Sequence, residues 1–560
     1  MTTKTHIASD ETLKELARTL GMLDYDGTPE GYHDVMRRWF HANGALTATS
    51  AELTALCDEW YRVTRVAWTG GTQFYQPDVS TVTTGTKTGD NAEMTCEPST
   101  DETQGTDDYA GHPLFAVTDC NWEMDADTLQ PVITQIEGIT TGFRRTDPDT
   151  LVGVLQMSGY IRTHDYGDYY VREYSSLPPQ AHTGEWAPLR EAVNPDGTVR
   201  EWVLHAKYMA SLEGTCLTSC AGRVVRGFLS HDTVHTYSHN LGTAYSGTCA
   251  CDDAFLKVMA YVKYGSLTLD GIMAGCVSDN HQYPALVAEE GVTRVIVDSA
   301  ASSYFEVGQS VLIGDYSSST DRGSLYGTSG AAGCKVTSVE TVTVDDTEYC
   351  AIGTDYGGTF DTGANGAATE GTTYVSSYGY PTGWTDCVLG NDGSPVSNTS
   401  GKYPCKLQGI EMMNGVYEII ADSILSMYAD DDGDYWYEPY TCPDSASQST
   451  SITSDYEASG ALFPQNASSA AWTYIAKLSD GCNGVMFPTE AGGGSSTLTC
   501  DAFYANAATT GSRKWMARGC LTGGSYAGLS CVHGLHDLSL AWWGCGARLS
   551  AAGNRGEWTA

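Results

Sequence analysis

Apolar residues recur every three or four positions near the start of the chain. The spacing holds within three runs: Leu13, Leu16, Ala17 and Leu20; Tyr32, Val35, Met36, Trp39 and Phe40; and Leu53, Leu56, Cys57, Trp60 and Tyr61. Such spacing is typical of helices that bury one face. Each run follows residue types that begin helices, namely Ser9-Asp10, Pro29 and Ser50. We predict a small helical unit over residues 1–70 with its aromatic stripe in the core; a docking face is the alternative.

The hydrophobic pattern then loses its helical period. Residues 70–108 are rich in Thr, Gly and Asp, which predicts a loop-heavy connection. Residues 151–155 and 169–171 read as strands, whereas 252–264 follows helical spacing with a buried and a solvated face. We predict a mixed α/β region over residues 71–293.

Short β-branched runs dominate the next segment. They are residues 294–298, 305–313, 334–339 and 340–344, separated by Gly, Ser and Asp turns. This pattern predicts an inserted small β domain over residues 294–375, either a sandwich or a barrel. The last predicted domain covers residues 376–560 and contains a helix around 470–478. The fold class is therefore α+β and multidomain.

Composition narrows the possible functions. The 62 Gly and 34 Tyr residues, with only 18% charged residues, are typical of loop-rich β structure. A net charge of -39 repels phosphates, so we expect neither nucleic acid nor an anionic membrane as partner. No apolar stretch is long enough to span a bilayer, and Met1 to Glu15 lacks a signal-peptide layout. We expect folding in a cytoplasm and the 18 cysteines to be thiols.

Three histidines lie four positions apart, at His231, His235 and His239. On a helix they would align as a zinc-binding face. The intervening Thr, Val and Tyr residues favour a strand or loop instead, where the alignment is lost. Neighbouring Asp232 and Ser230 do not make a hydrolytic triad, because a triad is recognised by geometry.

Two other patterns suggest metal ligands. Cys216 with Cys220, and Cys249 with Cys251, lack the Cys-x-x-Cys spacing of common zinc sites. The acidic run 430–434 resembles half of a calcium loop, but position 441 is Thr where the closing Glu of such a loop would stand. A solvated turn is the favoured interpretation. We predict no metal, no cofactor and no catalytic residue.

The segment 513–549 mixes two kinds of position. Its framework residues are glycines, small residues, indoles and an arginine, which permit close packing: Gly519, Gly523, Gly524, Ala527, Gly528, Trp542, Trp543, Gly544, Gly546, Ala547 and Arg548. Between them stand residues that share no chemistry and follow no period: Cys520, Leu521, Tyr526, Cys531, His533, Leu535, His536, Leu538, Leu540 and Cys545. This arrangement suits a surface whose side chains differ on a fixed backbone.

Two sets of residues carry a resemblance to a known family. The runs Gly524-Ser525-Tyr526, Ala527-Gly528-Leu529 and Gly546-Ala547-Arg548-Leu549 resemble the C-terminal end of phage and prophage proteins with a C-type-lectin-like fold. That group includes targets of diversity-generating retroelements, of which the major tropism determinant is the type example. Upstream, Gly409-Ile410-Glu411, Gly415, Asp422 and Ile424 are similar to a motif of phage lectin-like domains and, more distantly, of formylglycine-generating enzymes. Residues 416–420 depart from that motif.

The resemblance implies a tail-tip or tail-fibre receptor-binding protein of a virion. It would bind a bacterial surface receptor, protein or glycan, through a C-type-lectin-like domain, contact other tail proteins, and form a homo-oligomer such as a trimer. The expected ligand contacts are Cys520, Leu521, Tyr526, Cys531, His533, Leu535, His536, Leu538, Leu540 and Cys545, supported from beneath by Trp542, Trp543 and Arg548.

In that family, reverse transcription replaces adenines in chosen Asn codons. All of the residues Tyr526, Cys531, His533, Leu535, His536, Leu538 and Leu540 can be reached from an Asn codon in this way, whereas Trp cannot. Two alternatives stay open. One is a structural virion protein that is not diversified. The other is an enzyme of the formylglycine-generating type, whose paired cysteines we cannot match here; we expect no enzymatic activity.

Overall fold

The N-terminal helices form where their spacing predicts them. A computed structural model describes residues 27–182, 184–316 and 333–556. In it, α2 (Pro29–Ala42) is capped by Thr28, and α3 (Ser50–Val63) begins with a reciprocal cap between Thr49 and Glu52. The indoles of Trp39 and Trp60 lie 5.5 Å apart and are buried, so the aromatic stripe is part of the core. The helix expected around Leu13 to Leu20 lies outside the described residues.

Antiparallel sheets follow the helices. Their strands are β1 (Thr69–Tyr75), β2 (Thr86–Gly89), β3 (Thr118–Met124), β4 (Pro131–Ile136), β5 (Leu151–Met157), β6 (Tyr160–Asp165), β7 (Tyr169–Ser175), β8 (Ala187–Pro188) and β9 (Trp202–Ala206). One sheet has the order β2-β1-β7-β6-β8 and the other the order β4-β3-β5-β9. The strands predicted at 151–155 and 169–171 are confirmed as parts of β5 and β7.

Smaller elements connect these sheets to the rest of the body. Short antiparallel pairs are β10 (Ser211–Glu213) with β11 (Cys216–Thr218), β12 (Ser246–Gly247) with β31 (Leu549–Ser550), and β19 (Cys405–Leu407) with β20 (Ile410–Met412). Single 3-10 turns are η1 (Pro179–Ala181), η2 (Arg190–Ala192), η3 (Ser299–Ser303), η4 (Trp384–Cys387), η5 (Ser445–Ser447) and η6 (Gly524–Tyr526). None of the described helices is both long and apolar enough to cross a membrane.

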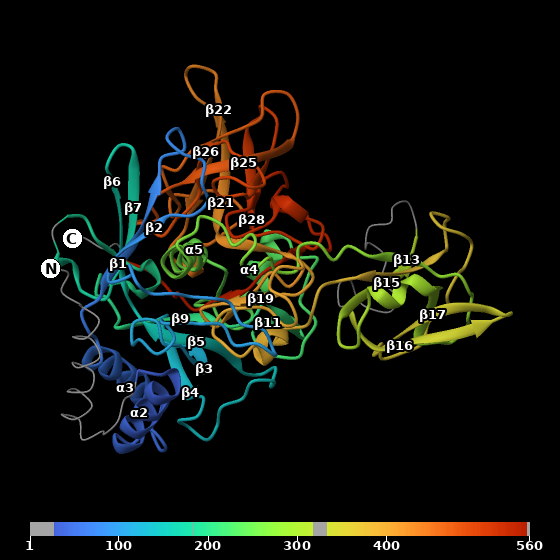
Figure 1. Cartoon of the computed structure of the whole chain (residues 1–560), viewed down its shortest axis with the longest axis horizontal. Helices are drawn as coiled ribbons and strands as arrows, with labels where there is room; N and C mark the ends of the chain where they lie inside the picture. Colours follow the sequence, from blue (N-terminus) through green and yellow to red (C-terminus); the bar gives the residue numbers. More distant parts are fainter. Residues whose placement is uncertain (1–26, 183, 317–332, 557–560) are drawn as a thin grey trace.

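The helix α5 (Ala250–Tyr264) lies in the middle of the body (Figure 1). The predicted helix is therefore confirmed, but the expected solvated face is wrong, because residues 250–263 are all buried. Its two lysines are neutralised inside the core. Lys257 Nζ lies 2.5 Å from Asp253, and Lys263 Nζ lies 2.9 Å from Asp392. An inward lysine is tolerated where a carboxylate meets it.

The segment with three histidines is the helix α4 (His231–His239), so the expectation of a strand or loop is wrong. Ser230 explains the start of the helix. Its Oγ accepts from the backbone N–H of Thr233 at 3.1 Å, and its own N–H donates to Thr233 Oγ1 at 2.7 Å. This reciprocal cap outweighs the weak helix preference of the Thr, Val and Tyr residues.

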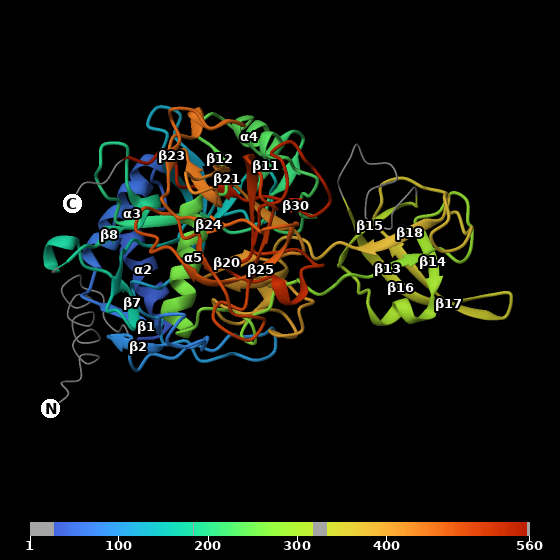
Figure 2. The same ribbon diagram turned by 90° about the horizontal axis from the view of Figure 1, so that it is seen from above.

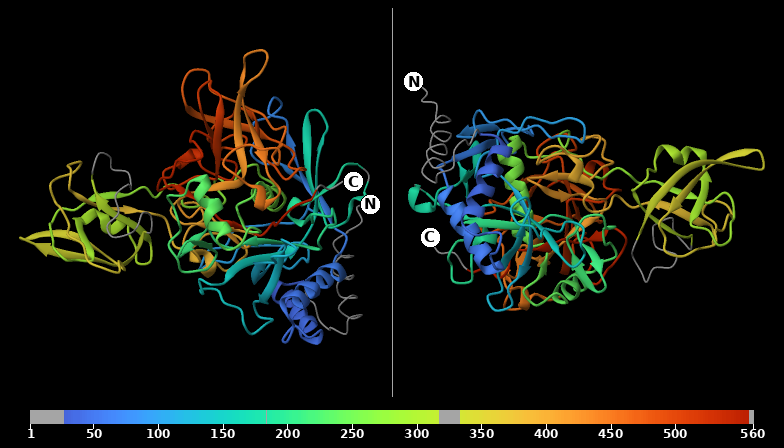
Figure 3. Two further views of the ribbon diagram at one scale, coloured as in Figure 1. Left: turned by 180° about the vertical axis from the view of Figure 1, so that it is seen from behind. Right: turned by 90° about the horizontal axis from the view of Figure 1, so that it is seen from below.

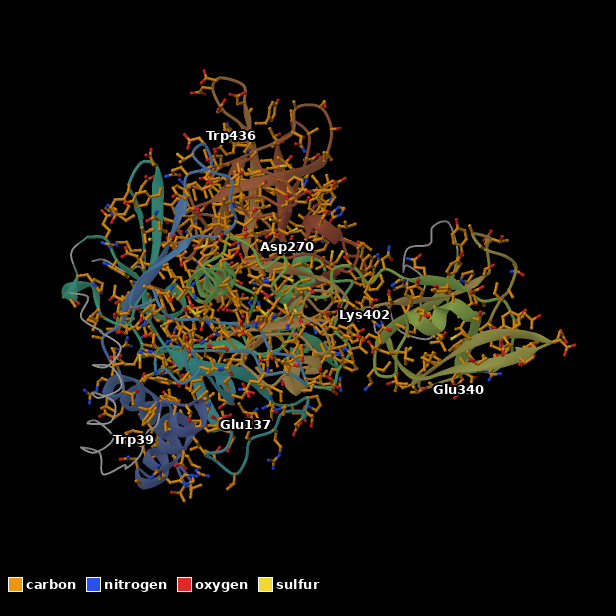
Figure 4. The ribbon with its side chains drawn as sticks, in the orientation of Figure 1. Trp39, Glu137, Asp270, Glu340, Lys402 and Trp436 are labelled. Carbon is orange, nitrogen blue, oxygen red and sulfur yellow. The ribbon has the colours of Figure 1, made fainter. Side chains whose placement is uncertain are left out.

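A separate lobe stands to one side of the body, as Figures 1, 2 and 3 show from different directions. Its strands are β13 (Gln282–Pro284), β14 (Arg294–Asp298), β15 (Ser310–Asp315), β16 (Cys334–Val344), β17 (Thr347–Thr354) and β18 (Thr373–Ser377), in the sheet order β13-β18-β15-β16-β17-β14. The lobe has a hydrophobic core of its own and contains the expected small β domain together with β13. Lys402, labelled in Figure 4 where the body meets the lobe, pairs with Glu306 at 3.2 Å.

The C-terminal part of the body is a mixed sheet that curls into a half-barrel. Its strands are β21 (Tyr417–Ala429), β22 (Tyr435–Thr441), β23 (Glu457–Ala458), β24 (Phe463–Pro464), β25 (Ala471–Leu478), β26 (Pro488–Ala491), β27 (Ala502–Ala505), β28 (Gly511–Ala517), β29 (Val532–His533) and β30 (Cys545–Gly546). The main order is β23-β22-β21-β28-β29-β27-β25-β26. The helix predicted around 470–478 is wrong, because β25 is a strand paired with β27.

One large core joins the N-terminal helices, the middle sheets and the C-terminal sheet. The N-terminal helices therefore pack into the same core as the sheets that follow residue 70, and Ser376 lies on β18, where the chain leaves the lobe. At the level of class, the chain is a β-rich, multidomain α+β protein.

Candidate functional site: an aromatic pocket on the C-terminal sheet

A cavity of about 470 Å³ opens on the C-terminal sheet. Its lining is aromatic and small polar: Tyr417, Trp472, Tyr504, Thr522, Gly523, Gly524, Ser525, Tyr526, His533 and Trp542. Strand pairing explains how residues distant in sequence meet there. Trp472 of β25 pairs with Tyr504 of β27, which in turn pairs with His533 of β29. Residues opposite one another on neighbouring strands point to the same face, so these three rings form a row.

The rings contact one another and form a continuous wall. Trp472 and Tyr526 are parallel, with centroids 5.1 Å apart and planes 2° apart. Tyr504 lies 4.9 Å from Trp472 and 4.9 Å from His533. The ring of Tyr417 is 5.3 Å from that of His533. Aromatic pairs at such distances hold one another in place, so the wall is formed before any ligand arrives.

Two buried polar atoms of the wall lack a partner. His533 is 6% exposed, and its Nδ1 has no hydrogen-bond partner among the described residues. The same holds for Nε1 of Trp542. Thr522 and Ser525 are exposed and bring hydroxyl groups to the edge of the cavity. An unsatisfied buried polar group costs about 1–3 kcal/mol, so a ligand that satisfies one gains affinity.

The pocket carries no formal charge at neutral pH. No Asp, Glu, Lys or Arg occurs among the described residues that line it. Burial lowers the pKa of His533 well below its usual value, and His536 and Lys514 lower it further. Burial also lowers the pKa of His536, whose ring stacks on His533 at 4.7 Å, to about 4. Both imidazoles are therefore neutral at pH 7.

A buried ion network lies beneath this sheet. Glu418 of β21 contacts Arg518 on one side, and its Oε1 accepts from Arg548 Nε at 3.1 Å on the other. Arg518 also lies 3.0 Å from Asp253 of α5. Arg548 donates to the backbone carbonyls of Lys207 and Glu411. The network ties the C-terminal motif to α5 and to β20.

The upstream motif residues have structural positions as well. The buried carboxylate of Glu411 accepts from the backbone N–H of Gly383 at 3.1 Å and of Thr385 at 2.9 Å. Asp422 lies 2.6 Å from Arg555 and caps the start of α5 at Ala250. These residues hold the backbone and do not line the pocket.

The structure divides the ten expected contact residues into groups. Tyr526 (36% exposed) and Leu540 (37%) are at the surface, and Leu535, His536 and Leu538 are half-buried. Cys520, Leu521, Cys531 and Cys545 are fully buried in the main core and cannot touch a ligand in this conformation. Tyr526 and His533 meet in the pocket, whereas Leu538 packs against a different cluster around Ile424. Of the expected supports, Trp543 and Arg548 are buried, and Trp542 lines the pocket itself.

Sequence reasoning missed the three rings that contribute most to the wall: Tyr417, Trp472 and Tyr504. They lie far apart along the chain, and the expected helix around 470–478 concealed the alternation of β25. The signal was present in the aromatic residues of Trp472-Thr473-Tyr474 and Phe503-Tyr504, which suit a pleated, half-exposed strand.

The other candidate sites have structural explanations. His231 and His235 lie edge to face at 4.6 Å within α4. The turn 430–434 joins β21 to β22, and Asp430 accepts backbone N–H groups of Asp432 and Asp434. Cys96, Asp107 and Asp392 could hold a metal by distance alone. Lys263 Nζ, at 3.2 Å from Asp107 and 2.9 Å from Asp392, already supplies the positive charge there.

Comparison with protein-family models and with curated protein sequences finds no match for this chain. The interpretation of the pocket therefore depends on its own geometry and chemistry.

Proposed function

We propose that the chain is a phage or prophage receptor-binding protein of the virion tail, which attaches to a bacterial surface through a C-type-lectin-like C-terminal domain. Ligand would bind in the aromatic pocket, at the part of the segment 513–549 that reaches the surface. The function is binding without chemistry.

One observation carries this proposal: the segment 513–549 supplies the rim of a preformed aromatic pocket, while its own framework residues are fixed below. Tyr526, Thr522 and Ser525 are exposed at the pocket, and Arg548 and Arg518 hold the backbone through Glu418. Exposed aromatic and hydroxyl side chains on a rigid base are the usual means of recognition in binding loops.

Burial reduces the number of positions in the segment 513–549 at which diversification is compatible with the fold. Exchangeable positions must reach solvent, and five positions that do so fit diversification: Tyr526, Leu535, His536, Leu538 and Leu540. Cys520, Cys531 and Cys545 do not, because replacing a buried core residue disturbs packing.

The enzyme alternative gains no support from the cysteines of this segment. Burial raises the pKa of the Cys531 and Cys545 thiols, whereas a nucleophilic cysteine needs a lowered one. The homotrimer and the attachment to other tail proteins are implied by the resemblance and belong to the same proposal.

Cell binding tests the proposed function. The purified, fluorescently labelled chain is mixed with a panel of Gram-negative and Gram-positive strains and measured by flow cytometry. We expect at least one strain to be labelled and Tyr526→Ala to weaken the labelling more than about tenfold, as loss of a central aromatic contact does.

Tyr166→Ala is the matched control. Tyr166 is 52% exposed and stacks on Tyr169 at 4.9 Å, as Tyr526 stacks on Trp472, but it lies on the β6–β7 hairpin. Equal labelling by the wild type, Tyr526→Ala and Tyr166→Ala would contradict the proposal. The absence of labelling on every strain would contradict it as well.

A further inference from the structure

We propose that the aromatic pocket binds a neutral sugar residue, a hexose, deoxyhexose or N-acetylhexosamine, of a bacterial surface polysaccharide. This inference rests on the proposed receptor-binding function and names the chemical class of its ligand. The recognition that we propose uses the side chains of the wall and rim.

The shape of the wall suits a pyranose ring. One face of many sugars is made of C–H groups and is apolar, while the hydroxyls stand around the edge. Such a face stacks on an aromatic ring. The pocket offers the stacked pair Trp472 and Tyr526 and, tilted by 41° against Trp472, the ring of Tyr504. The cavity of about 470 Å³ also falls in the range of about 300–1,000 Å³ that small-molecule sites occupy.

The polar atoms of the pocket suit the edge of a sugar. His533 Nδ1 and Trp542 Nε1 are buried and have no partner among the described residues. Hydroxyls both donate and accept, so the edge of a sugar can pair with the exposed hydroxyls of the rim, and it can pair with the buried nitrogens of His533 and Trp542 once a ring of the wall turns. Thr522 and Ser525 offer further hydroxyls at the rim.

Charge argues against the other ligand classes. A charged ligand must lose part of its hydration shell to enter the pocket, and no charged lining residue compensates for that loss. A cation would gain from the aromatic faces, but Lys514 lies close enough to affect both His533 and His536 and would repel it. An anion would meet no cationic side chain in the lining of the pocket, and the net charge of -39 repels it from the chain as a whole. A neutral, hydroxyl-rich ligand meets neither penalty.

Ligand-observed NMR tests the proposal directly on the full chain. Saturation-transfer spectra are recorded with glucose, galactose, mannose, rhamnose, N-acetylglucosamine and N-acetylgalactosamine, each at about 10 mM, where a millimolar complex is mostly occupied. Glucuronic acid and glucosamine serve as charged comparators. We expect at least one neutral sugar to bind and the charged sugars to bind at least about tenfold more weakly.

Variants locate the binding. Tyr526→Ala and Trp472→Ala should each weaken it more than about tenfold, Trp472→Phe should retain it because a flat ring remains, and Tyr166→Ala should leave it unchanged. Near-UV circular dichroism verifies that each variant is folded. The inference is overturned if no neutral sugar binds, if a charged sugar binds more tightly, or if Trp472→Ala and Tyr526→Ala bind like the wild type.

A second measurement separates this inference from the proposed function. Strains that the chain labels are treated with periodate, which cleaves vicinal diols of sugars, or with protease, and the labelling is then repeated. Loss of labelling after periodate supports the sugar ligand. Loss after protease alone overturns the sugar ligand and leaves a receptor-binding protein with a protein target. Sugar binding in solution without labelling of any strain supports the sugar ligand and rejects the receptor function.

Discussion

At the scale of single residues, Glu418 holds the region beneath the pocket together. Burial alone would raise the pKa of its carboxyl group, but Arg518 and Arg548 lower it overall. The adjacent Tyr417 forms part of the pocket, so the ion network and the wall share β21. A buried charge is stable only while its partners remain.

We predict that Glu418→Gln destabilises the chain by about 3–5 kcal/mol, because it leaves two buried guanidinium groups with less compensation. The midpoint of urea unfolding, followed by tryptophan fluorescence, measures this loss. Glu59→Gln is the control, because Glu59 pairs with Arg62 at 2.6 Å on the exposed side of α3 and such pairs contribute about 0–1 kcal/mol. Similar shifts for both variants would contradict the role assigned to Glu418.

Burial also predicts where natural variation falls along the segment 513–549. We expect substitutions at codons 526, 535, 536, 538 and 540 in the genes of related phages or lysogens, and fixed codons at 520, 521, 531 and 545. Sequencing the 3′ end of many such genes tests this expectation. Changes spread evenly over exposed and buried codons would remove the case for a diversified surface.

At the scale of elements, α4 makes the fold sensitive to acid. Burial, His231 and His239 lower the pKa of His235 to about 2, and neither ring nitrogen of His235 has a partner among the described residues. The folded state therefore keeps this imidazole neutral, whereas the unfolded chain protonates it below its ordinary pKa of about 6.5. The contribution to stability is complete above pH 6.5 and is lost as pH falls toward the lowered value.

We predict that His235→Gln reduces the loss of unfolding free energy between pH 7 and pH 5 by about 2 kcal/mol relative to wild type. Urea unfolding at both pH values measures the difference. His164→Gln, at an exposed position on β6, should leave the pH dependence as it is. An unchanged slope for His235→Gln would show that this imidazole does not stay neutral in the fold.

The elements also show how far the sequence could predict the structure. Periodic spacing located α2, α3 and α5, and a continuous apolar run located β5. The same reasoning failed at α4, because it overlooked the local cap at Ser230. It also failed for the lysines of α5, which point inward because Lys257 meets Asp253 of the same helix and Lys263 meets Asp392 of a distant segment. For residues 470–478, the pairing with β27 decides in favour of a strand.

At the scale of the whole molecule, the pocket needs contributions from β21, β25, β27, β29 and η6, which strand pairing alone brings together. The sequence indicated Tyr526 at the rim and His533 in the wall but missed Trp472 and Tyr504, since no local pattern reports which strands become neighbours. The body that supports this pocket has one core and the lobe has another, although Leu312 of the lobe strand β15 packs into the core of the body. We therefore expect the body to fold without the lobe.

The chain enters the lobe at β13 and leaves it at β18, and these two strands are paired. Gln282 and Ser376 are paired residues of β13 and β18, so a two-residue Asn-Gly turn can join them in place of residues 283–375. We predict that this shortened chain folds and keeps its ligand binding. The body loses the ion pair of Lys402 with Glu306 and the hydrogen bond from Gln309 to the buried Asp279, at 2.7 Å, and the lost hydrogen bond costs about 1–3 kcal/mol.

Circular dichroism, urea unfolding and cell labelling measure the outcome. Deletion of residues 29–63 is the control. It removes α2 and α3, whose Trp39, Phe40 and Trp60 belong to the shared core, and it should abolish folding. Aggregation of the shortened chain to the same extent as the control would mean that lobe and body stabilise each other and do not fold around independent cores.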